Sequence, residues 1–141
     1  KINTLGAINV IKFNQETLAR NNGSILLYST IAVKQGFTNH SIVSTAKGAI
    51  EGLTLSLAAE FAPKIRVNCI APSLTDAKMT QRLISNETIK KAIENMHPLP
   101  KIGSGDDFAD IGSFLLSNKN SWITGQIFHI DGGRSTLRIK S

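Results

Sequence analysis

The chain has 141 residues, of which 41% are hydrophobic and 18% are charged. This length supports one domain with a core and is too short for two ordinary domains, and the composition excludes a disordered protein. The formal net charge is +6, but the basic residues are scattered and do not interleave with aromatic residues. No apolar run approaches the roughly 20 residues of a membrane helix. We therefore expect neither a nucleic-acid partner nor a membrane partner.

Cys69 is the single cysteine of the chain, which excludes an internal disulfide and a cysteine-based metal cluster. It lies in the apolar run 65–71, where a free cysteine acts as a small core residue. This pattern fits a reduced, cytoplasmic setting, no cleavable signal segment is visible, and we expect no metal ion. The sequence begins at Lys1 in what looks like the middle of a helix, which indicates a portion of a longer protein.

The first two predicted elements are a helix and a strand. Apolar residues recur at near-helical spacing through residues 2–20, and the turn formers Asn21-Asn22-Gly23 end this helix. Residues 24–30 (SILLYST) are a short, mostly apolar run between turn formers. Such a run is typical of a strand that is buried on both faces.

A second helix is predicted for residues 41–61, where apolar residues form one stripe and Pro63 stops the helix. Leu55 and Ala59 fall outside that stripe. A helix that is apolar on two sides must be sandwiched within the fold or contact another subunit.

The remaining elements complete an alternating pattern. Residues 65–71 (IRVNCIA) predict a second buried strand, and residues 74–96 a polar helical excursion with few apolar anchors. Residues 106–116 predict a third core helix, and residues 126–130 a last strand. The order helix, strand, helix, strand, helix, strand is that of an α/β fold with a parallel sheet.

Five segments in this order resemble the second half of a short-chain dehydrogenase/reductase: residues 23–30, 44–54, 65–73, 122–126 and 131–133. The resemblance covers the chain nearly from end to end. It implies one domain over residues 1–141, the C-terminal half of a Rossmann-like, doubly wound parallel sheet. The N-terminal half of that fold, which binds the dinucleotide, is absent from this sequence.

The resemblance also implies a chemistry, the exchange of a hydride between a nicotinamide and an alcohol or carbonyl carbon. In the family a tyrosine passes the proton, and a lysine four residues on favours its phenolate, because a tyrosine has an ordinary pKa of about 10. Lys47 matches this lysine. Thr30 matches the serine that holds the substrate oxygen, and Asn3 matches an asparagine that supports a water relay to the lysine.

The cofactor is expected to be NAD or NADP. In the family the lysine at Lys47 also binds the cofactor ribose. Pro72, Ser73, Leu74 and Thr75 match the stretch that faces the nicotinamide amide, with Ser73 in place of the usual glycine.

The glycine-rich turn that binds the dinucleotide phosphates follows a strand in the family, and this sequence has no such turn. The glycine-rich stretch Gly103-Ser104-Gly105 follows a loop instead, so we interpret it as the start of a helix. Ser104 and Asp107 have the spacing of a capping box. The preference between NAD and NADP stays open.

Val43 stands where the family has its catalytic tyrosine. A valine side chain cannot donate, accept or ionise, so the proton-transfer step lacks its usual group. Tyr28, two residues before Thr30, would face the same side of a strand and is one candidate substitute. His40, just before the second helix, and Ser41, at its start, are others. The alternatives are that Tyr28 is a half-buried strand residue and His40 a loop residue.

Two hypotheses of function follow. The first is an NAD(P)-dependent oxidoreductase acting on a small alcohol or carbonyl substrate, with a substitute proton donor. The alternative is a non-catalytic relative that binds nucleotide or supports an oligomer. For the site residues, the alternatives are a surface lysine at Lys47, a strand residue at Thr30 and a helix-surface residue at Asn3.

The resemblance implies a homo-oligomer, either a dimer or a tetramer. In the family, the helices matching residues 2–20 and 41–61 pair across a dimer axis. The helix and strand matching residues 106–116 and 126–130 form the second interface of a tetramer. The second apolar side at Leu55 agrees with the dimer.

Overall fold

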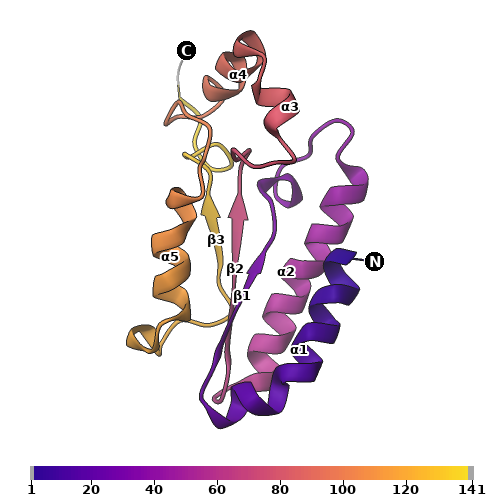
Figure 1. Ribbon diagram of the computed structural model, residues 1–141, viewed down its shortest axis with the longest axis vertical. Coiled ribbons are helices and arrows are strands. Elements are labelled where there is room, and N and C mark those ends of the chain that lie inside the picture. Colours follow the sequence, from indigo (N-terminus) through magenta and orange to yellow (C-terminus); the bar gives the residue numbers. More distant parts are fainter. Residues whose placement is uncertain (1, 140–141) are drawn as a thin grey trace.

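The computed structural model describes residues 2–139 and contains a three-stranded parallel sheet in the order β1-β2-β3 (Figure 1). The elements along the chain are α1 (Ile2–Arg20), β1 (Ser24–Tyr28), a 3-10 turn (Ile31–Val33), α2 (Ser41–Phe61), β2 (Arg66–Pro72), α3 (Gln81–Ile84), α4 (Glu87–Glu94), α5 (Asp106–Leu116), a second 3-10 turn (Asn118–Asn120) and β3 (Ile127–Ile130). The predicted α/β fold with a parallel sheet is confirmed. The sheet with its helices matches a Rossmann-like fragment.

The helices cover the two faces of the sheet. Helices α1 and α2 lie side by side on one face, and α5 lies on the other (Figure 1). Ile25 and Val67 pack toward α1 and α2 with Ile11 and Ala58, while Ile70 packs toward α5 with its partners Phe108 and Leu115. Burial of these two apolar layers against the sheet stabilises the fold.

Strand β2 is the centre of the sheet because it pairs with β1 on one edge and with β3 on the other. Five of its residues have no exposed surface: Val67, Asn68, Cys69, Ile70 and Ala71. The predicted core position of Cys69 is therefore confirmed, and its burial is the main reason why its pKa rises to about 11. A thiol with so high a pKa is an inert core group rather than a nucleophile.

Helix α5 begins one residue after the glycine-rich stretch that was interpreted as a helix start. Asp107 accepts hydrogen bonds from the Ser104 backbone nitrogen at 2.7 Å and from the Ser104 hydroxyl at 3.0 Å, so half of the predicted capping box is present. Hydrogen bonds from Lys101 and from Ser104 hold the pKa of Asp107 at about 2. An ionised carboxylate in the first turn favours the helix start.

The predicted strand over residues 24–30 is two residues too long, since β1 ends at Tyr28. The hydroxyl of Thr30 accepts a hydrogen bond from the Ala32 backbone nitrogen at 3.3 Å and caps the first 3-10 turn. This local bond competes with strand pairing and turns the chain away from the sheet. Within residues 2–139, no helix is long and apolar enough to cross a membrane.

Candidate functional site

The three parallel strands all end at one edge of the sheet, and α3 and α4 lie beyond that edge (Figure 1). In open α/β sheets this is the edge where ligands bind. Here the structure has a cavity of about 600 Å³. We call it the strand-end cavity; its lining residues are Ser29, Thr30, Ile31, Ala32, Phe37, His40, Pro72, Ser73, Leu74, Thr75, Ala77, Met79, Thr80, Leu83, Ile93, Met96 and Arg134.

Two predicted parts of the site meet in this cavity. Thr30 follows β1. The segment from Pro72 to Thr75 begins at the last residue of β2, which is the neighbouring strand. The Thr30 hydroxyl oxygen accepts the Ala32 N–H, which leaves its own proton available to a ligand. The two segments are brought together because adjacent parallel strands end at the same height.

Lys47 lies on α2 next to the end of β1. Its Nζ donates a hydrogen bond to the backbone oxygen of Tyr28 at 2.8 Å, and Lys47 is not among the residues that line the strand-end cavity. An ammonium group has three donors, so two remain for other partners. Asn3 is exposed near the start of α1, and its side chain has no hydrogen-bond partner within residues 2–139.

The expectation that Tyr28 and Thr30 face the same side is wrong. The Tyr28 hydroxyl points to the α5 face of the sheet, where it would lie 3.8 Å from a β-carbon at Gly112. The period-two rule applies within a strand, and the strand ends at Tyr28 before the chain turns at Thr30. Tyr28 does not line the strand-end cavity.

His40 is the sequence-derived candidate donor that does line the strand-end cavity. Its Nδ1 lies 2.8 Å from the Thr38 backbone oxygen, and its ring meets Phe37 edge to face at 5.5 Å between centroids. A carbonyl oxygen only accepts, so Nδ1 carries the proton and Nε2 is left to exchange one with a ligand. Val43 lies one helical turn after His40 and is 39% exposed.

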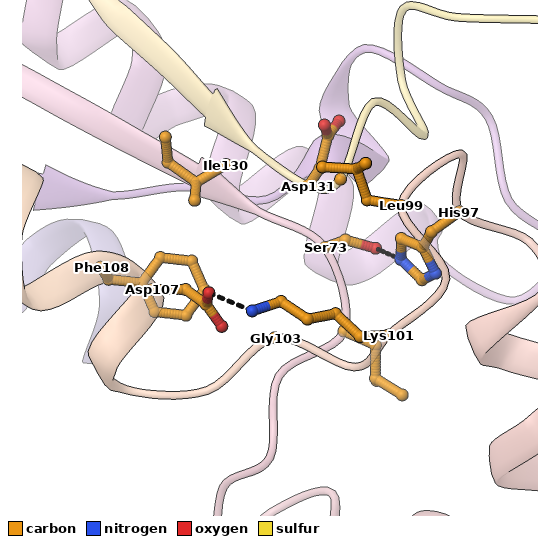
Figure 2. A pocket seen from close by; sticks show the side chains of 11 residues that line it. Ser73, His97, Leu99, Lys101, Gly103, Asp107, Phe108, Ile130 and Asp131 are labelled. Carbon is orange, nitrogen blue, oxygen red and sulfur yellow. Dashed lines mark hydrogen bonds and ion pairs between the residues drawn. The ribbon is translucent and has the colours of Figure 1, made fainter.

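A pair that the sequence did not indicate is Ser73 with His97 (Figure 2). Ser73 Oγ lies 2.8 Å from His97 Nε2, and His97 Nδ1 lies 2.8 Å from the Ile93 backbone oxygen. Because Nδ1 must donate to that carbonyl, the neutral ring accepts the Ser73 proton at Nε2. A lone histidine in a loop carries no sequence signal of this pairing.

The Ser73–His97 pair also borders a second, smaller cavity of about 230 Å³ on the α5 side (Figure 2). Phe108 and Ile130 form its apolar wall, and the Lys101–Asp107 ion pair lies at its rim. Within the described part of the chain, no three His, Cys, Asp or Glu residues are grouped closely enough to hold a metal ion.

The turn after β3 is organised by Asp131, which is buried. Its two oxygens accept backbone N–H bonds from Gly133 and Ser135, both at 2.9 Å. Burial opposes ionisation of this carboxyl, but the bonds from Ser135 and Gly133 outweigh it and lower its pKa. Gly132 and Gly133 adopt φ values of 60° and 85°, a region that favours glycine.

The lowered pKa of Asp131 predicts an acid-sensitive turn. Its stabilising contribution is complete above the unfolded-state pKa, about 3.9, and is lost as pH falls through the lower folded-state value. We expect the free energy of unfolding of Asp131→Asn to depend less on pH between 6 and 3 than that of the parent, as measured by urea denaturation. Asp110→Asn, at an exposed position, is the matched control and should keep the parent's slope. Equal slopes for the two variants would contradict this role.

The alternation of strands and helices, with polar residues gathered where the strands end, defines a Rossmann-type α/β protein. Comparison with known proteins supports this class of protein. The sequence profile of the family described as enoyl-(acyl carrier protein) reductase matches residues 1–135. Dehydrogenase/reductase SDR family member 4 of Sus scrofa is 36% identical over 118 residues, which are 83% of this chain and 42% of that protein.

Solved structures show the same relationship. Aldohexose dehydrogenase from Thermoplasma acidophilum superimposes with a TM-score of 0.91 at 28% identity, over 99% of this chain and 58% of that one. ElxO with NADP bound superimposes with a TM-score of 0.88 at 33% identity, over 96% of this chain and 56% of that one. The chain belongs to the short-chain dehydrogenase/reductase family. It spans less than two thirds of the length of each of these relatives.

Proposed function

We propose that the protein is an NAD(P)-dependent oxidoreductase acting on a small alcohol or carbonyl substrate. In this proposal, residues 1–141 form the C-terminal part of a Rossmann-type domain and hold the nicotinamide and the substrate. The supporting observation is the strand-end cavity, in which Thr30 and the segment from Pro72 to Thr75 lie together. The NADP-bound ElxO structure, which this chain resembles, also supports a nicotinamide cofactor.

The residues of the cavity fit the nicotinamide end of such a cofactor. Hydroxyl and backbone groups of Pro72, Ser73, Leu74 and Thr75 would face its amide, and the apolar wall of the cavity suits a flat ring. The Ser73 hydroxyl is engaged by His97, and the Thr75 hydroxyl donates to the Ser73 backbone oxygen at 3.1 Å. Backbone groups and the Thr75 hydroxyl oxygen, as an acceptor, would therefore make the contacts. When bound, the nicotinamide supplies or accepts the hydride.

The other site residues would hold the substrate and move the proton. Thr30 donates a hydrogen bond to the substrate oxygen. Lys47 binds the cofactor ribose through the two Nζ N–H groups that are not bonded to the Tyr28 backbone oxygen. His40 takes the place of the absent tyrosine. As an imidazolium, with a proton on each ring nitrogen, it gives the Nε2 proton to the carbonyl oxygen during reduction and keeps the Nδ1 proton on the Thr38 oxygen. An imidazole can act as a general acid and base without the neighbouring cation that a tyrosine needs. Asn3 would reach Lys47 through water, as its family counterpart does.

The alternative is a relative that binds nucleotide or supports an oligomer but has no turnover, and Val43 favours it. To separate the two, we would titrate the natural full-length protein with NADH and NADPH and assay a panel of carbonyls and alcohols. The proposal predicts cofactor binding and turnover in the parent protein. Binding without turnover, with turnover gained only in Val43→Tyr, would establish the non-catalytic alternative. Failure to bind either nucleotide would contradict both.

A homo-oligomer and a cytoplasmic location complete the proposal. Helix α1 exposes a row of apolar side chains, with Phe13 at 90% exposed, and Leu55 on α2 is 53% exposed. Burial of such a face in a dimer removes apolar surface from water. Light scattering of the natural protein would report the oligomeric state. The proposed cytoplasmic location is supported by the free thiol of Cys69, because thiols stay reduced in that compartment.

A further inference from the structure

Arg134 is the one permanently charged side chain among the residues that line the strand-end cavity. It follows the turn at Asp131 and is half-buried. The rest of the described lining is apolar or carries hydroxyl, imidazole and backbone groups, with no aspartate or glutamate. The cavity therefore has a positive charge and no negative one to balance it.

The contacts of Arg134 leave most of its hydrogen-bonding capacity unused. Its Nη1 donates to Ser73 Oγ at 3.4 Å, and its Nη2 lies 3.4 Å from Met96 Sδ. The guanidinium carbon lies 4.9 Å from the centroid of the Phe37 ring, which holds the group in place by a cation–π contact. These are long or weak contacts for a group with five N–H donors.

No carboxylate within residues 2–139 pairs with Arg134. The described ion pairs are Arg20–Glu16, Lys90–Glu87 and Lys101–Asp107, and none involves it. Asp131 is near enough to act on its charge, but both oxygens of Asp131 are engaged by backbone N–H groups. Burial lowers the pKa of Arg134, as expected of a cation partly removed from water. A half-buried cation of this kind is stabilised by an anion.

We propose that Arg134 binds a carboxylate of the substrate, so that the substrate class is an oxo acid or the corresponding hydroxy acid. This rests on the proposed oxidoreductase function of the same cavity. The planar guanidinium matches a carboxylate through two parallel N–H bonds. Met79, Leu83 and Ile93, from the α3–α4 side of the cavity, give the remainder of the substrate an apolar wall.

The step at the carbonyl is balanced without any further reactant. A hydride from the reduced nicotinamide would add to the carbonyl carbon, and His40, as an imidazolium, would give its Nε2 proton to the carbonyl oxygen and be left neutral with its proton on Nδ1. The oxo acid becomes a hydroxy acid, and the reduced nicotinamide becomes oxidised. The carboxylate on Arg134 is unchanged, so Arg134 fixes the orientation of the substrate and takes no part in the proton transfer.

The test compares phenylpyruvate with its neutral methyl ester in the natural full-length protein. Equilibrium binding is measured by calorimetry, and kcat/KM is measured with NADPH or NADH. We expect the parent protein to prefer the acid over the ester by at least about 10-fold, because a charge-assisted bidentate contact is strong. Arg134→Met should remove this preference and leave the affinity for the ester unchanged. Arg134→Lys should keep part of it.

Arg138→Met is the matched control, an exposed arginine of the same segment that does not line the cavity, and it should keep the parent's preference. Equal binding of acid and ester by the parent would overturn the inference. The inference would also be overturned if Arg134→Met weakened NADPH binding and left the acid preference intact, because Arg134 would then hold a cofactor phosphate. Absence of turnover with an intact acid preference in binding would count against the oxidoreductase function alone.

Discussion

His40→Gln should lower the rate of carbonyl reduction by about 100-fold or more, while cofactor affinity stays within about twofold of the parent's. Glutamine keeps the length and a hydrogen-bonding group but cannot exchange a proton. The expected loss is large because, in the proposed mechanism, Val43 supplies no phenol to perform this step. The measurement is kcat at saturating cofactor, with cofactor affinity followed by fluorescence titration.

A second substitution distinguishes a lost proton donor from a damaged cavity. Adding Val43→Tyr to His40→Gln should restore turnover, because the new phenol then lies one helical turn before Lys47 on the same helix. Ser41→Ala and Tyr28→Phe are the matched controls, since neither residue lines the strand-end cavity, and both should keep the parent's kcat. Unchanged kcat in His40→Gln, or a loss in Tyr28→Phe alone, would exclude His40 as the donor.

Arg66→Met should reduce the free energy of unfolding by about 3 kcal/mol. The guanidinium donates to the backbone oxygens of Leu115 at 2.8 Å and Ser117 at 2.9 Å, and to Asn120 Oδ1 at 2.6 Å. These bonds tie the start of β2 to the end of α5, where helix carbonyls lack intrahelical partners. Methionine keeps the apolar stem but leaves these acceptors without a charged donor. Urea denaturation followed by circular dichroism gives the value.

Arg20→Met is the control for this prediction. Arg20 forms an exposed ion pair with Glu16 one turn earlier on α1, at 3.2 Å, and such pairs contribute little. Arg20→Met should change the free energy of unfolding by less than about 0.5 kcal/mol. Equal losses for the two variants would show that Arg66 acts through its charge alone rather than through the helix end that it caps.

Much of the fold was predictable because it follows from local periodicity. Residues 41–61 and 106–116 were predicted as helices, and the structure has helices with these bounds. Strand β2 was predicted one residue early, at 65–71 rather than Arg66–Pro72. Hydrophobic spacing responds to the average environment of an element, whereas its last residue depends on single hydrogen bonds such as the one at Thr30.

The candidate site was predictable only in part. Thr30 and the segment from Pro72 to Thr75 were identified by resemblance, and strand order then placed them in one cavity. The prediction that Tyr28 and Thr30 face the same side was wrong, because it assumed two more strand residues. His97 was missed because it is a lone residue in a loop. Arg134 directly follows the segment 131–133, but that segment does not indicate which cavity the arginine side chain lines.

The amino-acid sequence by itself determined the order of helices and strands and the family, and it predicted that Val43 stands at the place of the catalytic tyrosine. These depend on spacing along the chain and on which side chains can ionise. The tertiary structure decided that Arg134 meets Ser73, 61 residues away in sequence, and that His40 rather than Tyr28 reaches the strand-end cavity. Contacts of this kind form only when parallel strands end side by side, because that edge gathers loops that are distant in the chain.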